Sequence, residues 1–320
     1  MHKKKIVILG TGGTIAGKAN NEGDNIGYTA GQVDVEKLVR AIPGLAVASN
    51  LVIEQVVQID SKDMTFVVWG QLAARVSYFL AQDDVRGVVI THGTDTIEET
   101  AYFLQAVVNT VKPVVLTCAM RPATALSPDG PQNVIDAIAV AEHAGAQGTM
   151  VVCAGVVHDA LSVQKTHTYQ LNAFSSGDAG PIGYVEEGKL RLVRNWPLAQ
   201  QNKRLIAIKN IALLGAGRAW PQVEIVMSYA GASGAVVKAL VASGVQGLVV
   251  AGTGNGTVHK ELEMALLQAQ AGGVSVVRAT RCVKGRVLRK AGDVFEDSGG
   301  LSPVKARIAL MLRVMDAAIC

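Results

Sequence analysis

The sequence predicts an α/β protein with a larger N-terminal domain, built on a mostly parallel sheet flanked by helices, and a smaller C-terminal α/β domain. Short aliphatic runs alternate with amphipathic stretches along most of the 320 residues, the pattern of successive βαβ units. Hydrophobic residues make up 49% of the chain and aromatic residues only 4%, as expected for aliphatic strands buried under helices. An irregular stretch rich in Gln, Asn and Gly interrupts the alternation, so we expect domains at residues 1–195 and 221–320, joined by a linker at 196–220.

In the first domain, strands are predicted where short apolar runs end at Gly, Asn or Asp: 6–9, 51–57, 87–90, 113–117 and 149–153. Helices are predicted where apolar residues recur every three to four positions: 33–41, 64–81, 96–107 and 131–144. Asp95 and Asp129 stand where the N-caps of the last two helices belong.

The second domain repeats the pattern on a smaller scale. Its predicted strands are 223–228, 247–251 and 274–278, and its predicted helices are 234–243, 257–271 and 302–318. No repeat of solenoid length and no low-complexity tract is present in the sequence.

Composition favours a small-molecule substrate in a reducing compartment. The formal net charge of +4 is small and dispersed, which argues against a nucleic-acid partner. Cys118, Cys153, Cys282 and Cys320 show no paired spacing, so we expect free thiols. No apolar run approaches the length of a membrane span, and the short apolar stretch after the first lysines is not a signal sequence. We therefore expect a cytoplasmic protein, although a chain from which a signal peptide has been removed would look the same.

Chemistry is expected in the loops that follow the strands, because open parallel sheets bind ligands beyond the carboxyl ends of their strands. Those loops are polar here: GTGGT at 10–14, DSKD at 60–63, THGTDT at 91–96, MRP at 120–122 and GTGNG at 252–256.

The first of these loops has two interpretations. It could be a dinucleotide phosphate loop, but Ile15 takes the place of the third glycine and the following residues do not read as a helix. Alternatively, the glycines make room for a substrate and bring the Thr14 hydroxyl to the sheet edge.

A second hydroxyl, that of Thr94, ends another central strand and opens a helix, where backbone N–H groups can stabilise developing negative charge. A threonine becomes a nucleophile only when a base takes its proton, so a lysine or tyrosine must lie near. His92 could also be the base, but its place just inside the strand favours a buried, hydrogen-bonded histidine.

These two loops resemble both signatures of the bacterial-type L-asparaginases: TGGTIAG at 11–17 and THGTDTIEETA at 91–101. Further similar motifs follow in the same order as in that family: MRP at 120–122, DGPQN at 129–133, GNG at 254–256 and PVKAR at 303–307. The resemblance covers essentially the whole chain and implies hydrolysis of L-asparagine to L-aspartate and ammonia. No metal and no cofactor is expected.

The resemblance also assigns roles to individual residues. Thr14 becomes the first nucleophile, with Tyr28 of a mobile lid at 18–31 beside it, and Thr94, Asp95 and Lys165 become a second catalytic group. The implied substrate-binding residues are Gly13, Asp60, Ser61, Lys62, Gly93, Thr94, Asp95 and Asn255. Among them, Ser61 and nearby amides hold the α-carboxylate, Asp95 accepts from the α-ammonium, and the Thr94 backbone N–H stabilises the oxyanion.

The resemblance implies a homodimer or homotetramer with sites at the subunit interface, since Asn255 would serve the adjoining subunit. Two departures from the family stand out. Lys62 replaces a Gln or Glu, and could pair with the substrate carboxylate or point to solvent. The stretch 281–290, where the family presents a glutamate to its neighbour, is basic. One of the acids beyond it, Asp293, Glu296 or Asp297, could reach the neighbouring site by a different path, but the flanking glycines favour an ordinary surface turn.

Three alternatives to a strict L-asparaginase stay open. A glutaminase-asparaginase of mixed specificity would use the same residues, because one methylene changes discrimination by only about 1–3 kcal/mol. A nucleotide-binding oxidoreductase would need a clear ribose-binding acid, which the sequence lacks. A non-catalytic amino-acid-binding regulator would have little use for two threonines, a tyrosine and a lysine together.

Overall fold

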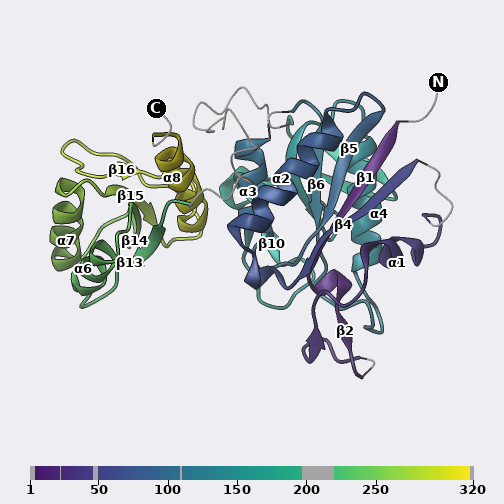
Figure 1. Ribbon diagram of the computed structural model, residues 1–320, viewed down its shortest axis with the longest axis horizontal. Helices are drawn as coiled ribbons and strands as arrows, with labels where there is room; N and C mark the ends of the chain where they lie inside the picture. Colours follow the sequence, from purple (N-terminus) through teal and green to yellow (C-terminus); the bar gives the residue numbers. More distant parts are fainter. Residues whose placement is uncertain (1–3, 22, 46–49, 109, 197–219, 318–320) are drawn as a thin grey trace. The chain divides into compact units, whose positions relative to one another are not determined.

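A computed structural model describes residues 4–21, 23–45, 50–108, 110–196 and 220–317, and the chain divides into two compact units at residues 217 and 218. Both units have the predicted α/β architecture (Figure 1). The expected linker at 196–220 lies almost wholly outside the described residues.

The first unit is built on an eight-stranded sheet of order β12-β11-β8-β7-β6-β5-β1-β4. Its five parallel strands are β1 (Lys5–Gly12), β4 (Leu51–Ile59), β5 (Val85–Thr91), β6 (Pro113–Thr117) and β7 (Gly148–Cys153). Each of them contains a predicted strand. The remaining three are antiparallel: β8 (Val156–Asp159), β11 (Gly183–Glu186) and β12 (Lys189–Leu192).

Helices cover both faces of this sheet. The α1 (Val35–Arg40) and α4 (Gly130–Glu142) helices bury their apolar residues in one core with Ile6, Ile8 and Val89. Side chains alternate along a strand, so Val7, Leu9, Val88 and Ile90 face the opposite side. The α2 (Phe66–Leu80) and α3 (Ile97–Val107) helices pack there, and the sheet is buried on both faces as a parallel sheet requires.

Capping explains where two helices begin. Asp34 accepts a hydrogen bond from the Glu36 N–H, so α1 starts at Val35 rather than at residue 33. The Thr65 hydroxyl accepts from the Val68 N–H in the same way, so α2 starts at Phe66 rather than at residue 64. The prediction of Asp95 as an N-cap is wrong, because the cap position of α3 is Thr96 and the Asp95 carboxylate is held by a lysine instead.

Two tight hairpins create the antiparallel part that the sequence analysis did not predict. Ala154 and Gly155 both have positive φ, at 50° and 73°, and let β8 fold back on β7. Glu187 and Gly188 do the same between β11 and β12, at 50° and 70°. Such turns are usually signalled by Asn-Gly or Asp-Gly, and neither pair occurs here.

The second unit has a parallel sheet of order β13-β14-β15-β16, formed by β13 (Val223–Met227), β14 (Gly247–Gly252), β15 (Ser275–Thr280) and β16 (Glu296–Asp297). The α6 (Ala235–Ala242) and α7 (Lys260–Ala271) helices share a core with one face of this sheet. The α8 helix (Pro303–Ala317) packs on β13, β14 and β15. The three predicted strands and three predicted helices are confirmed within a few residues.

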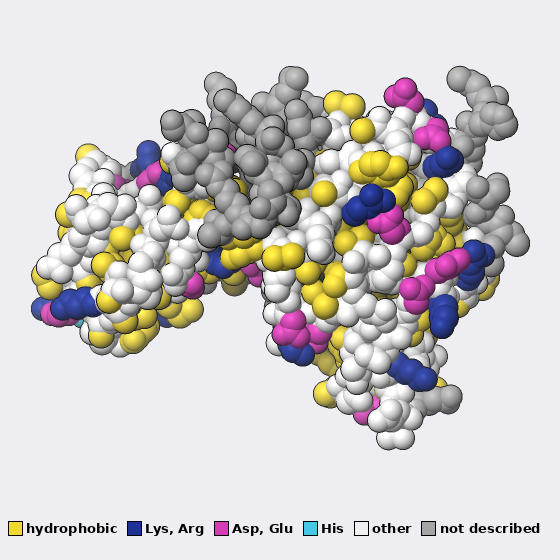
Figure 2. Space-filling model, in the orientation of Figure 1, with side chains coloured by type: hydrophobic (Ala, Val, Ile, Leu, Met, Phe, Trp, Pro, Cys, Tyr) yellow, Lys and Arg dark blue, Asp and Glu magenta, His cyan; other side chains and the backbone are white. Residues whose placement is uncertain are grey.

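Three features considered in the sequence analysis can be compared with this structure. Cys118, Cys153 and Cys282 carry free thiols, and Cys320 lies outside the described residues. On the face of the molecule shown in Figure 2, basic side chains lie among acidic ones rather than in a broad patch of one sign. No helix of the described residues is long and apolar enough to cross a membrane.

Candidate active site

Two glycines bring the threonine loops together at the carboxyl ends of β1 and β5. These strands are neighbours in register, with Gly10 opposite Thr91. A Cβ atom on Gly13 would lie 2.3 Å from the Gly93 Cα, and a Cβ on Gly93 would lie 2.4 Å from the Ser61 Oγ. Neither position can carry a side chain, and Gly13 also has a φ of 82°. The loops that carry Thr14, Ser61 and Thr94 are therefore in direct contact.

Thr14 is paired with the predicted tyrosine. It is only 7% exposed, and its Oγ1 lies 2.6 Å from the Tyr28 hydroxyl. Tyr28 opens β3 (Tyr28–Thr29), which pairs antiparallel with β2 (Lys18–Ala19), so the predicted lid segment forms a small hairpin. A Cβ on Gly17 would lie 2.8 Å from the Tyr28 ring. Gly17, which the sequence analysis did not select, therefore makes room for the ring beside Thr14.

Thr94, Asp95 and Lys165 form a connected group. The Lys165 ammonium donates to the Thr94 Oγ1 at 2.8 Å and to the Asp95 Oδ1 at 2.6 Å. Lys165 lies in the short strand β9 (Gln164–Lys165), which pairs antiparallel with β10 (Phe174–Ser175). Thr94 is 6% exposed, whereas the Asp95 side chain is 52% exposed and can be reached by a ligand. The structure thus brings Lys165 to two predicted residues, Thr94 and Asp95, that lie 71 and 70 positions earlier in the chain.

Ser61, in the loop at residues 60–63, is hydrogen-bonded to the loop that carries Thr94 and Asp95. Ser61 is 2% exposed, and its hydroxyl oxygen accepts from the Asp95 backbone N–H at 3.2 Å. The Thr96 hydroxyl donates to the Ser61 carbonyl at 2.7 Å. Because the Ser61 oxygen serves as an acceptor here, its own proton stays available for a ligand carboxylate.

Lys62 has a partner that neither alternative foresaw. Its ammonium forms an ion pair with the Asp60 carboxylate at 2.8 Å, while Asp60 also caps the short turn η2 (Ser61–Asp63) through the Lys62 backbone N–H. The Asp60 hydrogen bond and charge raise the pKa of the Lys62 ammonium, so it stays charged. Asp60 thus has a structural role in this turn, besides the binding role that the family resemblance implies.

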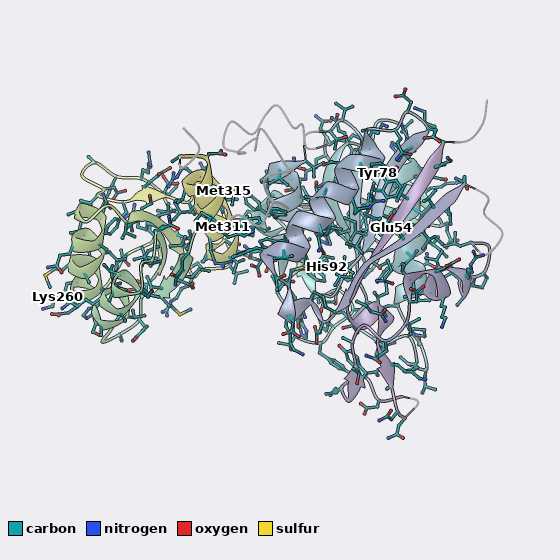
Figure 3. The ribbon with its side chains drawn as sticks, in the orientation of Figure 1. Glu54, Tyr78, His92, Lys260, Met311 and Met315 are labelled. Carbon is teal, nitrogen blue, oxygen red and sulfur yellow. The ribbon has the colours of Figure 1, made fainter. Side chains whose placement is uncertain are left out.

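His92 is buried beneath the loop rather than exposed to it. Its exposed fraction is 0%, and Figure 3 shows it inside the first unit. Its Nδ1 lies 2.8 Å from the Gly93 carbonyl oxygen and its Nε2 lies 2.9 Å from the Thr100 Oγ1. Burial lowers the pKa of His92 to about 4, so the ring is neutral at pH 7. Both nitrogens are occupied, which favours the packed, hydrogen-bonded histidine over the general base.

Asn133 and Asp129 fix the neighbouring loop at residues 120–122, a role that the sequence analysis did not predict. Asp129 is the N-cap residue of α4, as expected, but its side chain makes no capping hydrogen bond. The Asp129 carboxylate accepts from the Met120 and Arg121 backbone N–H groups, each at 2.9 Å. The Asn133 amide donates to the Cys118 carbonyl and accepts from the Ala154 N–H, which ties the ends of β6 and β7 together. The available signal was the four-residue spacing of Asp129 and Asn133, which places both on one helix face.

In the second unit, Asn255 and the three acids all have partners nearby. The Asn255 side chain donates to the Leu288 carbonyl at 3.0 Å and accepts from the Leu288 N–H at 2.7 Å. Asp293, Glu296 and Asp297 form ion pairs with Arg278, Arg313 and Arg289, respectively. The expectation of an ordinary surface turn is wrong, because Glu296 and Asp297 form strand β16 and the side chains of Asp293 and Asp297 are only 9% and 8% exposed in their ion pairs.

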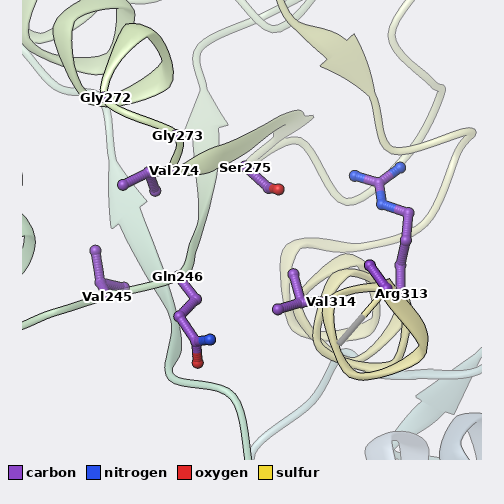
Figure 4. A pocket seen from close by; sticks show the side chains of 9 residues that line it. Val245, Gln246, Gly272, Gly273, Val274, Ser275, Arg313 and Val314 are labelled. Atoms are coloured by element: carbon purple, nitrogen blue, oxygen red, sulfur yellow. The ribbon is translucent and has the colours of Figure 1, made fainter. Parts of the chain in front are cut away.

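A cavity of about 490 Å³ in the second unit is not part of this chemistry (Figure 4). It lies where β14 and β15 begin, between Gln246, Ser275 and Arg313, whereas parallel sheets bind ligands where strands end. The charged group at its edge, Arg313, already pairs with Glu296. Among the described residues, no cluster of His, Cys, Asp and Glu could hold a metal ion.

Comparison with known proteins shows the family to which the chain belongs. A family profile described as "Asparaginase, N-terminal" matches residues 5–198, and one described as "Glutaminase/Asparaginase C-terminal domain" matches residues 222–316. The chain belongs to the asparaginase family.

Individual relatives are similar over nearly their whole length. The chain is 41% identical to L-asparaginase 2 of Escherichia coli (strain K12), over 96% of this chain and 88% of that protein. It is 36% identical to a glutaminase-asparaginase of Pseudomonas fluorescens biotype A, over 96% and 85%. The crystal structure of a probable cytoplasmic L-asparaginase from Campylobacter jejuni superposes with a TM-score of 0.90 at 39% identity, covering 98% of this chain and 95% of that one.

The buried state of His92 predicts a pH-dependent stability. Its folded pKa of about 4 lies below the ordinary value of 6.5, so between these values the unfolded chain binds a proton that the folded chain does not. The unfolding free energy should therefore fall as the pH drops from 6.5 towards 4, by up to about 1.4 kcal/mol per pH unit from this group. Urea unfolding of wild type and His92→Gln across this range measures the effect.

The readout is the difference between the two slopes, because other acids contribute equally to both proteins. His259→Gln is the matched control, since it removes a histidine that is only partly buried. Equal slopes for wild type and His92→Gln would contradict the prediction.

Proposed function

We propose that this protein is an L-asparaginase, which hydrolyses L-asparagine to L-aspartate and ammonia through a threonine nucleophile. One observation carries the proposal. Thr14 and Thr94, both largely buried, lie on loops whose backbones are in contact. The Thr14 hydroxyl is hydrogen-bonded to the Tyr28 hydroxyl, and the Thr94 hydroxyl is hydrogen-bonded to Lys165, which forms an ion pair with Asp95. Relatives named L-asparaginase support it. Ammonia release from asparagine, from glutamine and without substrate, measured side by side, tests it.

In the first half of the proposed reaction, the Thr14 Oγ1 attacks the side-chain amide carbon. The proton of Thr14 passes through the Tyr28 hydroxyl, which is 2.6 Å away. The carbon–nitrogen bond breaks, ammonia leaves with the proton, and an aspartyl ester of Thr14 remains. The Thr94 backbone N–H stabilises the negative oxygen of the tetrahedral intermediate.

In the second half, water hydrolyses the ester with help from Thr94, Lys165 and Asp95. The lysine Nζ lies between the Thr94 hydroxyl and the Asp95 carboxylate. When Lys165 enters this step as a neutral amine, it takes the Thr94 proton while Thr94 takes a proton from water, and Asp95 balances the charge of the ammonium that forms. The hydroxide attacks the ester carbon, aspartate leaves, and Thr14 regains its proton. No other reactant is required.

Substrate binding uses the groups around these threonines. The Ser61 hydroxyl proton and nearby amides, including that of Gly93, bind the α-carboxylate, and the exposed edge of Asp95 accepts from the α-ammonium. The backbone of Gly13 leaves space for the reacting amide beside Thr14.

A glutaminase-asparaginase is the second candidate, because relatives with that name match the chain at 36% identity. The other two alternatives find less support. The loop at residues 10–14 leads into η1 (Thr14–Ala16), a single short turn, so the long helix whose N-terminus binds a dinucleotide phosphate is missing at this point. A regulator would not need the Thr94–Lys165–Asp95 group.

We also propose a cytoplasmic location. The free thiols of Cys118, Cys153 and Cys282 support it, as does the similarity to the probable cytoplasmic L-asparaginase from Campylobacter jejuni. A relative from Haemophilus influenzae is named a probable periplasmic L-asparaginase, so cell fractionation is the deciding measurement.

The proposal assigns separate roles to the two threonine hydroxyls, and this predicts the effect of removing each. Thr14→Ala and Thr94→Val should each lower turnover by about a thousandfold or more, while the thermal unfolding temperature changes little. Thr149→Val makes a comparable change at a buried threonine of β7 and should keep wild-type turnover. A Thr14 or Thr94 variant with more than about a tenth of wild-type turnover would rule out the assigned role.

Lys165 should control how the rate depends on pH. If it receives a proton during turnover, the wild-type rate falls on acidification, and Lys165→Met loses both most of its activity and this dependence. Lys112→Met is the control, since the Lys112 ammonium binds the Gln82 carbonyl away from the site. A Lys165→Met enzyme with an unchanged pH–rate profile would exclude lysine from the mechanism.

We further propose that the active unit is at least a homodimer, in which Asn255 supports the adjoining subunit's site. The apolar surface of α6 supports association, because Val236 and Val241 are 47% and 41% exposed and Val237 is its one buried residue. Sedimentation should show an oligomer, and Val236→Glu with Val241→Glu should dissociate it and lower activity. Met264→Glu, on the exposed side of α7, is the control. A fully active monomer would overturn this proposal.

A further inference from the structure

A chain of three buried side chains lies directly beneath the Thr94 loop. The Trp69 Nε1–H of α2 donates to the Thr100 Oγ1 of α3 at 2.9 Å. Thr100 Oγ1 lies 2.9 Å from the His92 Nε2, and the His92 Nδ1 lies 2.8 Å from the Gly93 carbonyl oxygen. The exposed fractions are 4% for Trp69 and 0% for Thr100 and His92.

These hydrogen bonds allow one arrangement of protons. The indole N–H can only donate and the Gly93 carbonyl can only accept. The His92 Nδ1 must therefore carry the imidazole proton, and the Nε2 of the neutral ring is an acceptor. The Thr100 hydroxyl, which accepts from Trp69, donates its own proton to that Nε2. Each side-chain N–H, O–H and ring nitrogen of Trp69, Thr100 and His92 then has a hydrogen-bond partner, as buried polar groups require.

The end of this chain fixes a peptide bond of the site. Gly93 is a residue whose backbone has little conformational preference of its own, so the orientation of the Gly93–Thr94 peptide needs an external restraint. The hydrogen bond from His92 holds the Gly93 carbonyl towards the protein interior. In a planar trans peptide the N–H points opposite to the carbonyl, so the Thr94 N–H is turned away from His92 and towards the loop surface.

We propose that Trp69, Thr100 and His92 form a positioning device that holds the Gly93–Thr94 peptide with the Thr94 N–H facing the substrate. His92 then takes no part in proton transfer, and the Thr100 hydroxyl, by donating to Nε2, stabilises the tautomer with the proton on Nδ1 that the Gly93 carbonyl requires. The inference rests on the proposed function, in which that N–H stabilises the oxyanion. If the Thr94 N–H is no longer held in place, binding of the transition state is weakened more than binding of the substrate. The loss should therefore appear as a lower kcat rather than a higher KM.

The decisive variant is Thr100→Val, which removes the hydroxyl and keeps the side-chain shape. We expect kcat to fall about tenfold with KM within about twofold, a smaller loss than deletion of the donor itself would cause. The variant Thr100→Ser keeps the hydroxyl group and should therefore keep most of the wild-type kcat. Thr149→Val again controls for loss of a buried threonine hydroxyl elsewhere.

Nitrogen-15 NMR of the imidazole rings provides a readout independent of substrate. The His92 signals, identified by their loss in His92→Gln, should show a proton on Nδ1 in wild type and in Thr100→Ser, and loss of this single tautomer in Thr100→Val. A proton on Nε2 in wild type would overturn the proposal, even if Thr100→Val fails to fold. So would a Thr100→Val enzyme that keeps kcat, or one that loses activity through KM alone. Failure of the proposed function would look different, because wild type itself would release no ammonia from asparagine.

Discussion

The close approach of the Gly13 and Gly93 backbones is the constraint on which the active site depends. Parallel pairing of β1 with β5 brings both loops to one edge of the sheet, but pairing alone leaves room between them. Only residues without a side chain let the two backbones touch and let Ser61 press against Gly93. Thr14 and Thr94, each one position further along, then share one location although 80 residues separate them. A single methyl group would have to displace backbone atoms of Gly93 if placed on Gly13, and the buried Ser61 side chain if placed on Gly93, and close-packed interiors resist both.

The polar groups around this contact are arranged in two layers with different exposure. The outer layer contains the groups that could meet a ligand, and Asp95 and Lys165 there are partly open to solvent. The inner layer consists of buried groups that hold the outer ones through the backbone, namely His92, Thr100 and Trp69 below one loop and Asn133 below another. A hydrogen bond that is shielded from water is stronger than one exposed to it. The buried side chains can therefore fix the positions of the loops, while the partly exposed side chains remain accessible to a ligand.

The family assignment and the departures from its pattern belong to different parts of the chain. In the first unit Thr14, Ser61, Thr94, Asp95 and Lys165 lie on segments that hydrogen-bond or touch one another. In the second unit, Asn255 organises the segment around Leu288, and the acids beyond the basic run are engaged by arginines of their own unit. Asp293, Glu296 and Asp297 are thus already paired within the second unit. If association brings this unit to a neighbouring site, it will present a basic segment there.

Local sequence determined the main helices, the five parallel strands of the first unit and three of the four in the second, and it pointed to the candidate reacting groups. Periodicity and caps such as Asp34 and Thr65 act over a few residues, and a hydroxyl next to glycines at a strand end can be recognised from neighbours alone. The hairpins at Ala154 and Glu187 escaped prediction because tertiary pairing imposed their positive φ on residues with no such preference. Only the tertiary structure decided that Lys62 pairs with Asp60, that Asp95 binds Lys165 rather than capping a helix, and that His92 is a buried neutral ring. Those outcomes depend on distances and burial created by residues far away in the chain, and electrostatic preferences follow that environment rather than the local sequence.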